Sequence, residues 1–432
     1  MKLSKHKLGE LIEVTRGASL SGQFYAEEGE FVRLTLGNFN MNGGGFKENT
    51  SKTDLYYTGT VKDEFILNKG DIITPLTEQS LGLLGTTARI PESGKYIQSQ
   101  DVALVKCKKG LLDPNFCYYL ISSSVVRQQL SAGAQQTKIR HTSPDKIKDC
   151  TVWIPELEVQ KRIGRILSDI DEKIALNRQI NDNLEAMAKQ LYDYWFVQFD
   201  FPNEEGKPYK SSGGAMAWNE KLKREIPQGW NDCKIKDFMR IFTGKKDVSK
   251  AVPGNYKFFS CAPEPISSNE YIYDGYAVLV SGNGSYTGRV GFYKGKFDLY
   301  QRTYACVLDE DEHNISFFYY TLRYLFQPIY SGGKHGSSIP YIVLGDLADF
   351  RFAFNETICT KFVNATKPMF DEQLLRQKEI EVLTKQRDEL LPLLMNGQAS
   401  VNYHLFVMQS RLSSYRRLPP FYVLLYTFCV SV

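Results

Sequence analysis

The stretch VQKRIGRILSDIDEKIALNRQINDNLEAMAKQLYDYWF, Val159–Phe196, alternates apolar residues with charged ones along its whole length. Its apolar side chains recur mostly three or four residues apart, at Ile163, Ile166, Ile170, Ile174, Leu184, Met187, Leu191 and Trp195. This spacing places an apolar stripe along one side of an α-helix and is typical of a coiled-coil seam. We therefore predict one continuous helix, about 57 Å long at a rise of 1.5 Å per residue.

A second stretch near the C-terminus repeats this pattern. Its apolar positions are Leu374, Ile380, Leu383, Leu390 and Leu394. Asn396 and Gly397 follow as a C-terminal helix stop. Pro368 lies upstream, where it would remove a backbone hydrogen bond and crowd the preceding turn. We expect the second helix to begin, kink or change partner near that proline.

The two helical stretches close two copies of one sequence module. Five anchors of the first half recur 200 positions later in the same order: Arg89, Gly133, Ile139, Ile147 and Asp149 become Arg289, Gly333, Ile339, Leu347 and Asp349. Upstream, LGELIEVTRG from Leu8 aligns with IKDFMRIFTG from Ile235 at a shift of 227. The first copy therefore holds 27 extra residues between Gly17 and Arg89. Copies related in this way are expected to share a fold and to present different loops.

Each copy begins with short β-branched and aromatic runs separated by Gly, Asn and Asp, as in KGDIITPL from Lys69 and DGYAVLVSGNG from Asp274. Such runs are typical of strands. The sequence thus predicts an α+β protein with two tandem globular α/β modules and two long helices. The predicted boundaries are 1–155 for the first module, 156–199 for the central helix, 200–230 for a linker, 231–355 for the second module, 356–398 for the C-terminal helix and 399–432 for a tail.

The bulk composition limits the class of protein. A chain of 432 residues is too long for one hydrophobic core, and 42% hydrophobic with 24% charged residues is typical of a folded protein. A net charge of +4 allows a nucleic-acid partner without the strong basic signature of many such proteins. The 8 cysteines form no CxxC pair, and neither an export leader nor an apolar run of membrane-spanning length is visible. We expect a cytoplasmic protein without a membrane segment.

Several motifs carry a family resemblance. They are MAKQLYDYWFVQFDFP at Met187–Pro202, GKPYKSSGGAM at Gly206–Met216, IPQGW at Ile226–Trp230, the SGG…IP pattern at Ser331–Pro340 and RDELLPLLMNGQ at Arg387–Gln398. Together they resemble specificity subunits of type I restriction-modification enzymes over almost the whole chain. The tail beyond Gln398 departs from that family's pattern.

The resemblance implies two target-recognition domains that each contact one half of a split double-stranded DNA target. It also implies two antiparallel coiled-coil helices that set their separation, in a pseudo-two-fold internal repeat. The implied partners are two methyltransferase subunits, which bring S-adenosylmethionine, and restriction/translocase subunits, which use ATP. This chain itself is expected to bind neither cofactor.

Two loops at matching positions of the two copies are our main DNA-facing candidates. Glycine-flanked loops can approach DNA closely, while Lys, Arg, Ser and Gln supply phosphate contacts and hydrogen bonds to base edges. For any single residue the alternative is an ordinary solvated loop. The candidates are Arg89, Gln135, Gln136, Thr137, Lys138, Arg140, His141, Asn283, Arg289, Arg302, Lys334, His335, Ser337 and Ser338.

One motif hints at catalysis. DPNF at Asp113–Phe116 is similar to the DPPY or NPPY element of adenine methyltransferases, but Asp followed by Pro is also a favoured helix start. The second copy has Ser316–Tyr320 at this place without Asp-Pro, so we favour the helix start and predict no catalytic residue. The five histidines show no metal-ligand spacing, and we predict no metal site.

Two alternatives stay open. A non-catalytic adaptor with two protein-interaction modules would fit the weak net charge. A DNA adenine methyltransferase would fit only DPNF.

Overall fold

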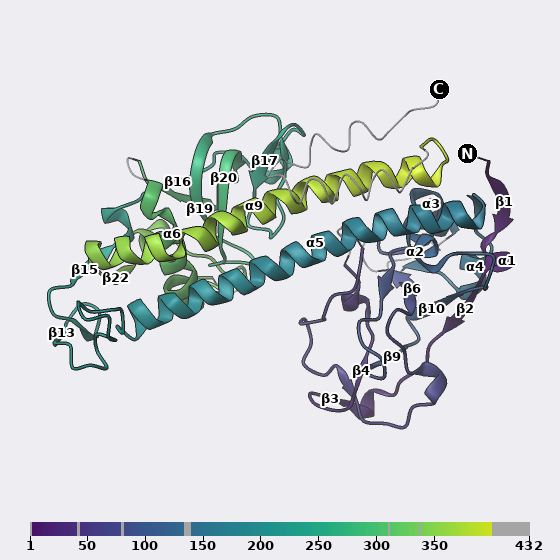
Figure 1. Ribbon diagram of the computed structural model, residues 1–432, viewed down its shortest axis with the longest axis horizontal. Helices are drawn as coiled ribbons and strands as arrows, with labels where there is room; N and C mark the ends of the chain where they lie inside the picture. The colour runs from purple at the N-terminus through teal and green to yellow at the C-terminus, as the bar shows by residue number, and fades with distance from the viewer. Residues whose placement is uncertain are drawn as a thin grey trace. The chain divides into compact units, whose positions relative to one another are not determined.

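The computed structural model describes residues 2–40, 44–78, 82–133, 140–309, 312–336 and 338–399. The chain divides into two units: unit 1 is Met1–Asn177 with Lys378–Val432, and unit 2 is Arg178–Gln377. Each unit contains one part of each of two long helices, α5 (Leu157–Tyr192) and α9 (Glu356–Met395) (Figure 1).

The first long helix confirms the periodicity of the sequence. Helix α5 has 36 residues, about 54 Å at the α-helical rise, and continues into a π-helical turn at Asp193–Val197. Its apolar stripe is buried in unit 1 at Ile163, Ile166, Ile170 and Ile174. In unit 2 the predicted stripe residue Trp195 is buried, but the expectation for Met187 is wrong, because this side chain is 51% exposed and Ala188 next to it is buried instead. Burial of this stripe stabilises a helix that isolated propensity alone would leave marginal.

The second long helix corrects one expectation. Helix α9 is a single α-helix from Glu356 to Met395, so Pro368 does not mark its beginning. Val363 and Phe370 are buried on either side of this proline, and their packing offsets the lost hydrogen bond. The predicted stop is confirmed, because the helix ends at Met395 and Gly397 adopts a φ of +72°.

Polar contacts join α5 to α9 within each unit, and in unit 1 they show the relative direction of the two helices. In unit 1, Asp171 accepts from Arg387 at 2.9 Å, and Asn177 donates to Glu379 at 2.9 Å. Residue numbers fall along α9 as they rise along α5, so the two segments of unit 1 are antiparallel. In unit 2, the Gln373 side chain donates to the Asn181 carbonyl at 3.3 Å.

Unit 1 combines two four-stranded sheets, in the orders β2-β10-β6-β8 and β3-β5-β4-β9, with the two-stranded pairs β1-β12 and β11-β7. Its strands are β1 (Ser4–Lys7), β2 (Ile12–Arg16), β3 (Tyr25–Ala26), β4 (Phe31–Arg33), β5 (Tyr56–Tyr57), β6 (Ile72–Pro75), β7 (Thr77–Glu78), β8 (Ala88–Arg89), β9 (Tyr96–Ile97), β10 (Val102–Cys107), β11 (Arg140–His141) and β12 (Thr151–Ile154). Its short helices are α1 (Leu8–Leu11), α2 (Pro114–Ser122), α3 (Ser124–Gly133) and α4 (Pro144–Lys148).

Unit 2 combines a six-stranded sheet, in the order β16-β21-β19-β20-β17-β18, with the pairs β15-β22 and β13-β14. Its strands are β13 (Met216–Asn219), β14 (Arg224–Pro227), β15 (Asn231–Lys234), β16 (Arg240–Thr243), β17 (Tyr256–Phe259), β18 (Ile266–Ser268), β19 (Tyr273–Ser281), β20 (Val290–Leu299), β21 (Thr303–Val307) and β22 (Arg351–Phe354). Its short helices are α6 (Ile315–Thr321), α7 (Gln327–Tyr330) and α8 (Leu344–Ala348).

The sequence repeat is also a repeat of strand order. In unit 1 the order is β2-β10-β6-β8, and in unit 2 the matching part is β16-β21-β19-β20. The pair Ser4↔Ile154 of β1-β12 corresponds to Asn231↔Phe354 of β15-β22, which preserves both shifts, 227 and 200. Between Gly17 and Arg89, where the first copy holds its 27 extra residues, lie β3, β4 and β5, which form a sheet with β9. Leu34 and Leu67 are fully buried there, in a cluster that also contains Val102 and Leu104 of β10.

The segment 200–230, expected as a linker, is folded into unit 2. It carries the hairpin β13-β14, and Phe201, Ile226 and Trp230 lie in the core of that unit. The rings of Phe201 and Trp230 stack with centroids 5.2 Å apart.

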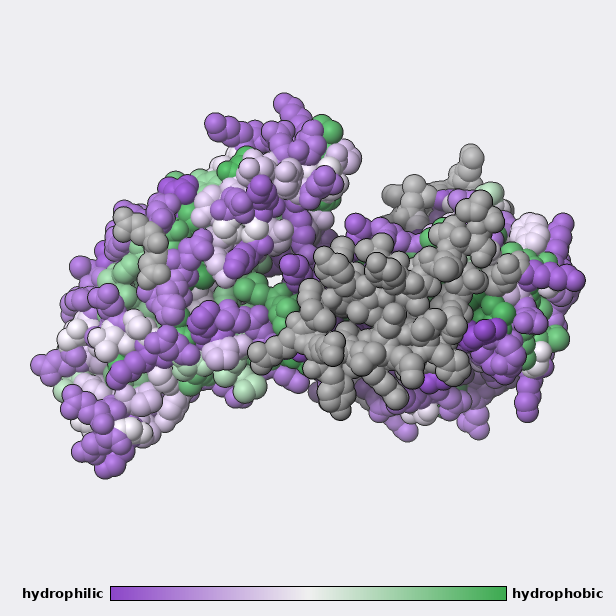
Figure 2. All heavy atoms as spheres, turned by 45° about the horizontal axis from the view of Figure 1, so that its top comes forward, coloured by the Kyte–Doolittle hydropathy of each residue, from purple (hydrophilic) through white to green (hydrophobic). Residues whose placement is uncertain are grey.

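Hydrophilic side chains predominate over the described part of the face seen in Figure 2, with smaller apolar patches between them. No helix within the described ranges has both the length and the apolar content that crossing a bilayer requires.

Candidate nucleic-acid interface

Two loops of unit 2 are joined by backbone hydrogen bonds. One follows β19 and begins at Gly282, and the other precedes α8. The Gly284 amide donates to Pro340 at 3.0 Å, and the Ile342 amide donates to Gly282 at 2.9 Å. The backbones of Asn283 and Tyr341 form an antiparallel bridge between the two loops. The candidate Asn283 therefore lies beside the candidate loop from Lys334.

Two further candidates project from the second of these loops. Lys334 is exposed, with Nζ 4.3 Å from the centre of the Tyr330 ring. His335 is exposed as well, and its Nε2 lies 3.1 Å from Asp346 Oδ2. Ser338 is exposed on the same loop, whereas Ser337 lies outside the described residues.

Arg302 adds a second positive side chain, besides Lys334, next to these loops. Its carbonyl accepts from the Gly282 amide at 2.9 Å, and its side chain belongs to an exposed residue. The structure thus brings together four candidates that the sequence spreads over about fifty positions: Asn283, Arg302, Lys334 and His335.

A thiol that sequence reasoning missed fixes the orientation of Asn283. Cys261 Sγ donates to Asn283 Oδ1 at 3.1 Å. With its oxygen held in this way, the amide presents its NH₂ group as the remaining donor. No signal in the sequence relates these two residues, which lie 22 positions apart.

Arg289 points into the protein. Its Nη2 donates to the Ala262 carbonyl at 2.6 Å, so the guanidinium ties β20 to the turn after β17. Burial, and secondarily the nearby positive charge of Arg323, lower the pKa of Arg289. Arg289 is half-buried, and its guanidinium is held by a backbone carbonyl of its own unit.

Unit 1 joins the equivalent segments. The Thr142 amide donates to Leu76 at 2.8 Å, as Ile342 does to Gly282 in unit 2. Next to this bond, β7 pairs with β11 through Glu78↔Arg140 and Thr77↔His141. The two repeats therefore bring the same two segments together in each module.

A buried carboxylate organises this part of unit 1. Glu78 is 2% exposed, and its Oε2 accepts from three consecutive backbone amides, Gly82 at 3.1 Å, Leu83 at 2.9 Å and Leu84 at 3.0 Å. Its Oε1 lies 3.1 Å from Arg140 Nη1. Arg140 is thus engaged in an ion pair inside the module. Glu78 was missed because TEQS at 77–80 has the composition of an exposed turn.

The remaining candidates of unit 1 divide into three groups. His141 is exposed on β11. Arg89 is tied to α2, because its Nη2 donates to Asn115 at 2.7 Å and its guanidinium lies 5.0 Å from the centre of the Tyr118 ring. Gln135, Gln136, Thr137 and Lys138 lie outside the described residues.

The motif DPNF starts a helix. Asp113 Oδ1 accepts from the Phe116 amide at 3.0 Å, and Pro114 is the first residue of α2. This is the N-cap geometry that the sequence predicted. In the part of the chain that the structure describes, no group of three or more His, Cys, Asp or Glu side chains is placed to hold a metal ion.

The shared framework and paired loops agree with the comparisons to known proteins. The family model described as type I restriction modification DNA specificity domain matches residues 2–186 and 227–354. The chain belongs to this family. The resemblance inferred from the sequence motifs is therefore confirmed, and both pairs of joined segments lie within the matched residues.

Individual relatives of this specificity family support the assignment. The chain is 25% identical over 324 residues to the type I restriction enzyme MjaIX specificity subunit of Methanocaldococcus jannaschii. The aligned residues cover 68% of this chain and 71% of that protein. It is 32% identical over 180 residues to the EcoDI specificity subunit of Escherichia coli, covering 40% of this chain and 39% of that protein. The crystal structure of a type I S subunit from M. genitalium has the same fold, with a TM-score of 0.57 and 17% identity over 91% of this chain and 96% of that one.

Proposed function

We propose that this chain reads DNA sequence for a type I restriction-modification complex and carries no catalytic residue of its own. The observation that supports the proposal most is the repeated pair of joined segments, one pair in each module of a specificity-family chain. In unit 2 this pair presents an amide, two cations and a histidine together, at Asn283, Arg302, Lys334 and His335. Side-chain amides form hydrogen bonds with base edges, and Lys and Arg side chains bind phosphates and guanine.

Each module would read one half of a split, asymmetric target. The modules share strand order but differ in the 27 extra residues and in their loops, KIRH at Lys138–His141 against KHGSS at Lys334–Ser338. Different loops on one framework favour two different half-sites over a palindrome.

The two long helices would form a coiled-coil spacer and relate the modules by a pseudo-two-fold axis. Helix α5 is about 54 Å long, and adjacent major-groove half-sites lie about 34 Å apart, so the helix is long enough for two modules on successive turns of DNA. Methyltransferase subunits with S-adenosylmethionine, and restriction/translocase subunits with ATP, would complete the complex.

The test is to map modified bases in cells that express the parent or a variant together with its matched methyltransferase partner. Asn283→Ala combined with Lys334→Ser should relax or abolish one half-site, since a good base contact discriminates by about 1–3 kcal/mol. Replacement of Gln135–His141 should change only the other half-site. Lys223→Ser, an exposed lysine on the β13-β14 turn, is the control and should leave the motif intact.

A palindromic parent motif, or a loop replacement that alters both halves, would refute the two-reader proposal. A salt titration separates DNA binding from a protein-interaction adaptor. Affinity for DNA should fall steeply as salt rises because phosphate contacts release counterions, while an apolar protein interface would change little.

A further inference from the structure

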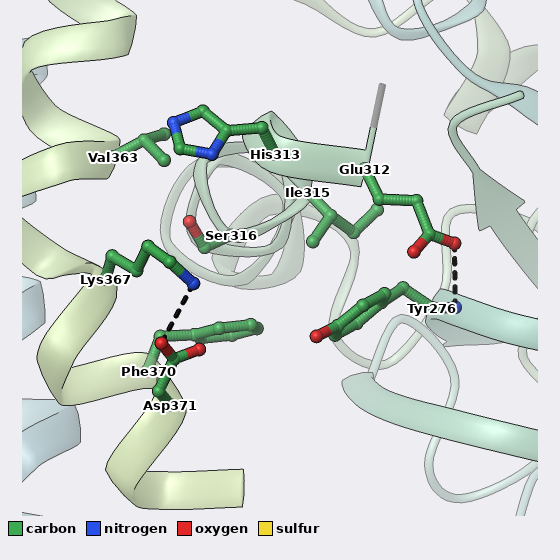
Figure 3. Close-up of a pocket in the computed structure, with 9 residues that line it drawn as sticks. All are labelled: Tyr276, Glu312, His313, Ile315, Ser316, Val363, Lys367, Phe370 and Asp371. Carbon is green, nitrogen blue, oxygen red and sulfur yellow. Dashed lines mark hydrogen bonds and ion pairs between the residues drawn. The ribbon is translucent and has the colours of Figure 1, made fainter. Parts of the chain in front are cut away.

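A cavity of about 330 Å³ lies in unit 2 among β19, α6 and α9, and its lining contains no residue of the joined loops (Figure 3). It is lined by Tyr276, Glu312, His313, Ile315, Ser316, Val363, Lys367, Phe370 and Asp371. This volume is at the lower end of the range for small-molecule pockets, so it suits one long side chain or a small metabolite.

The cavity is apolar in its middle and charged at its edges. Figure 3 shows the rings of Tyr276 and Phe370 extending toward one another from opposite sides, with Ile315 beside them. Ile315 and Phe370 are buried residues. The Glu312 carboxylate stands at one end, and the pair Lys367–Asp371, 2.9 Å apart, stands at the other. This arrangement matches an extended ligand with an apolar stem and a charged head.

The charge at the Glu312 end favours a cation. Glu312 has no ion-pair partner among the described residues, and its Oε1 accepts only a long 3.4 Å hydrogen bond from the Tyr276 amide. It is also the last of four consecutive acidic residues, Asp309–Glu312. The positive groups nearby have partners already: Lys294 donates to the Tyr276 hydroxyl at 2.7 Å, Lys367 is paired with Asp371, and His313 Nε2 contacts Asn364 at 3.1 Å.

A buried hydroxyl gives an independent sign of a ligand. Ser316 lines the cavity, is only 3% exposed, and makes no side-chain hydrogen bond within the described residues. Its hydroxyl group can therefore bond to a ligand in the cavity that carries hydrogen-bond donors or acceptors.

We infer that this cavity binds the guanidinium side chain of an arginine, with its head at Glu312 and its stem over Phe370 and Ile315. A guanidinium fits better than an ammonium group, because it pairs with a carboxylate through two parallel hydrogen bonds and stacks on an aromatic ring such as Tyr276. The arginine comes either from a protein that docks on this face or from a free guanidinium metabolite.

The first experiment uses the full chain alone and N-acetyl-arginine methylamide, detected by ligand-observed NMR. Saturable binding with a Kd on the order of 1–10 mM is expected for one side chain. Glu312→Gln should weaken binding about fivefold, since a partly solvated ion pair contributes up to about 1 kcal/mol. Lys367→Gln should tighten binding about two- to fivefold, because it removes a competing cation and frees Asp371.

Glu204→Gln makes the same chemical change at an exposed residue of another loop and should have no effect. N-acetyl-aspartate methylamide should not show saturable binding. The inference is overturned if Glu312→Gln binds arginine as the control does, or if the aspartate derivative binds as tightly as the arginine derivative.

The second experiment identifies the source and rests on the proposed function, since it uses the methyltransferase partner. If that subunit supplies the arginine, Glu312→Gln should weaken and Lys367→Gln should strengthen its association. If association is unchanged while the NMR response holds, the methyltransferase subunit is excluded as the source of the arginine. Failure of the NMR arm refutes this inference and leaves the DNA-reading proposal standing.

Discussion

The carboxylate of Glu78 is the part of the unit 1 site whose role can be tested most directly. It accepts three backbone hydrogen bonds from residues 82–84 and pairs with Arg140. Glu78→Gln keeps the size and one acceptor oxygen but removes the charge. We expect the turn at 82–84 to loosen and Arg140 to lose its partner.

The magnitude follows from burial. Removing one partner of a fully buried ion pair costs about 3–5 kcal/mol. The Arg140 side chain is 20% exposed and also donates to Ser131 Oγ at 3.1 Å, so about 2–3 kcal/mol is expected here. At 1.36 kcal/mol per tenfold change, that corresponds to roughly 30- to 150-fold faster hydrogen exchange when reclosing is fast and exchange reports the opening equilibrium.

The assay is amide hydrogen exchange of Gly82, Leu83 and Leu84 in the full chain. Glu92→Gln, an exposed carboxylate of the same module, is the matched control. Glu78→Gln and Arg140→Met should combine less than additively, because they remove the same interaction. Exchange at 82–84 that rises less than about threefold in Glu78→Gln would show that the carboxylate does not hold this turn.

Two further predictions concern the helices. Leu390→Asp places a carboxylate in the core of unit 1, so it should lower the free energy of unfolding by about 3–5 kcal/mol and reduce assembly with the methyltransferase subunit. Leu393→Asp, at an exposed position of the same helix, is the control and should do neither. If thermal unfolding and complex size show equal damage in the two variants, the assignment of the buried side of the helix is wrong. Asp113→Ala should cost about 1 kcal/mol through loss of the N-cap while the assembled complex still methylates DNA, and a folded, assembled variant without methyl transfer would contradict the purely structural role.

The sequence by itself determined the features that depend on neighbouring positions. The three-or-four spacing predicted α5, Asp113 and Pro114 predicted the start of α2, and Gly397 predicted the end of α9. The repeat also predicted that the loop from Lys334 belongs to a site, and the structure places Asn283 beside it. Periodicity and caps act over a few residues, so they can be read without knowing the fold.

Only the tertiary structure decided which side chains point outward. Arg89 and Arg289 match in the repeat as candidates, yet each donates to a group inside its own module. Glu78 became an organising residue because β11, 62 positions away, brings Arg140 against it. Pro368 was tolerated because apolar side chains on both sides of it are buried. Burial and charge pairing depend on segments that come into contact only in the folded chain. The local composition around a residue therefore does not predict them.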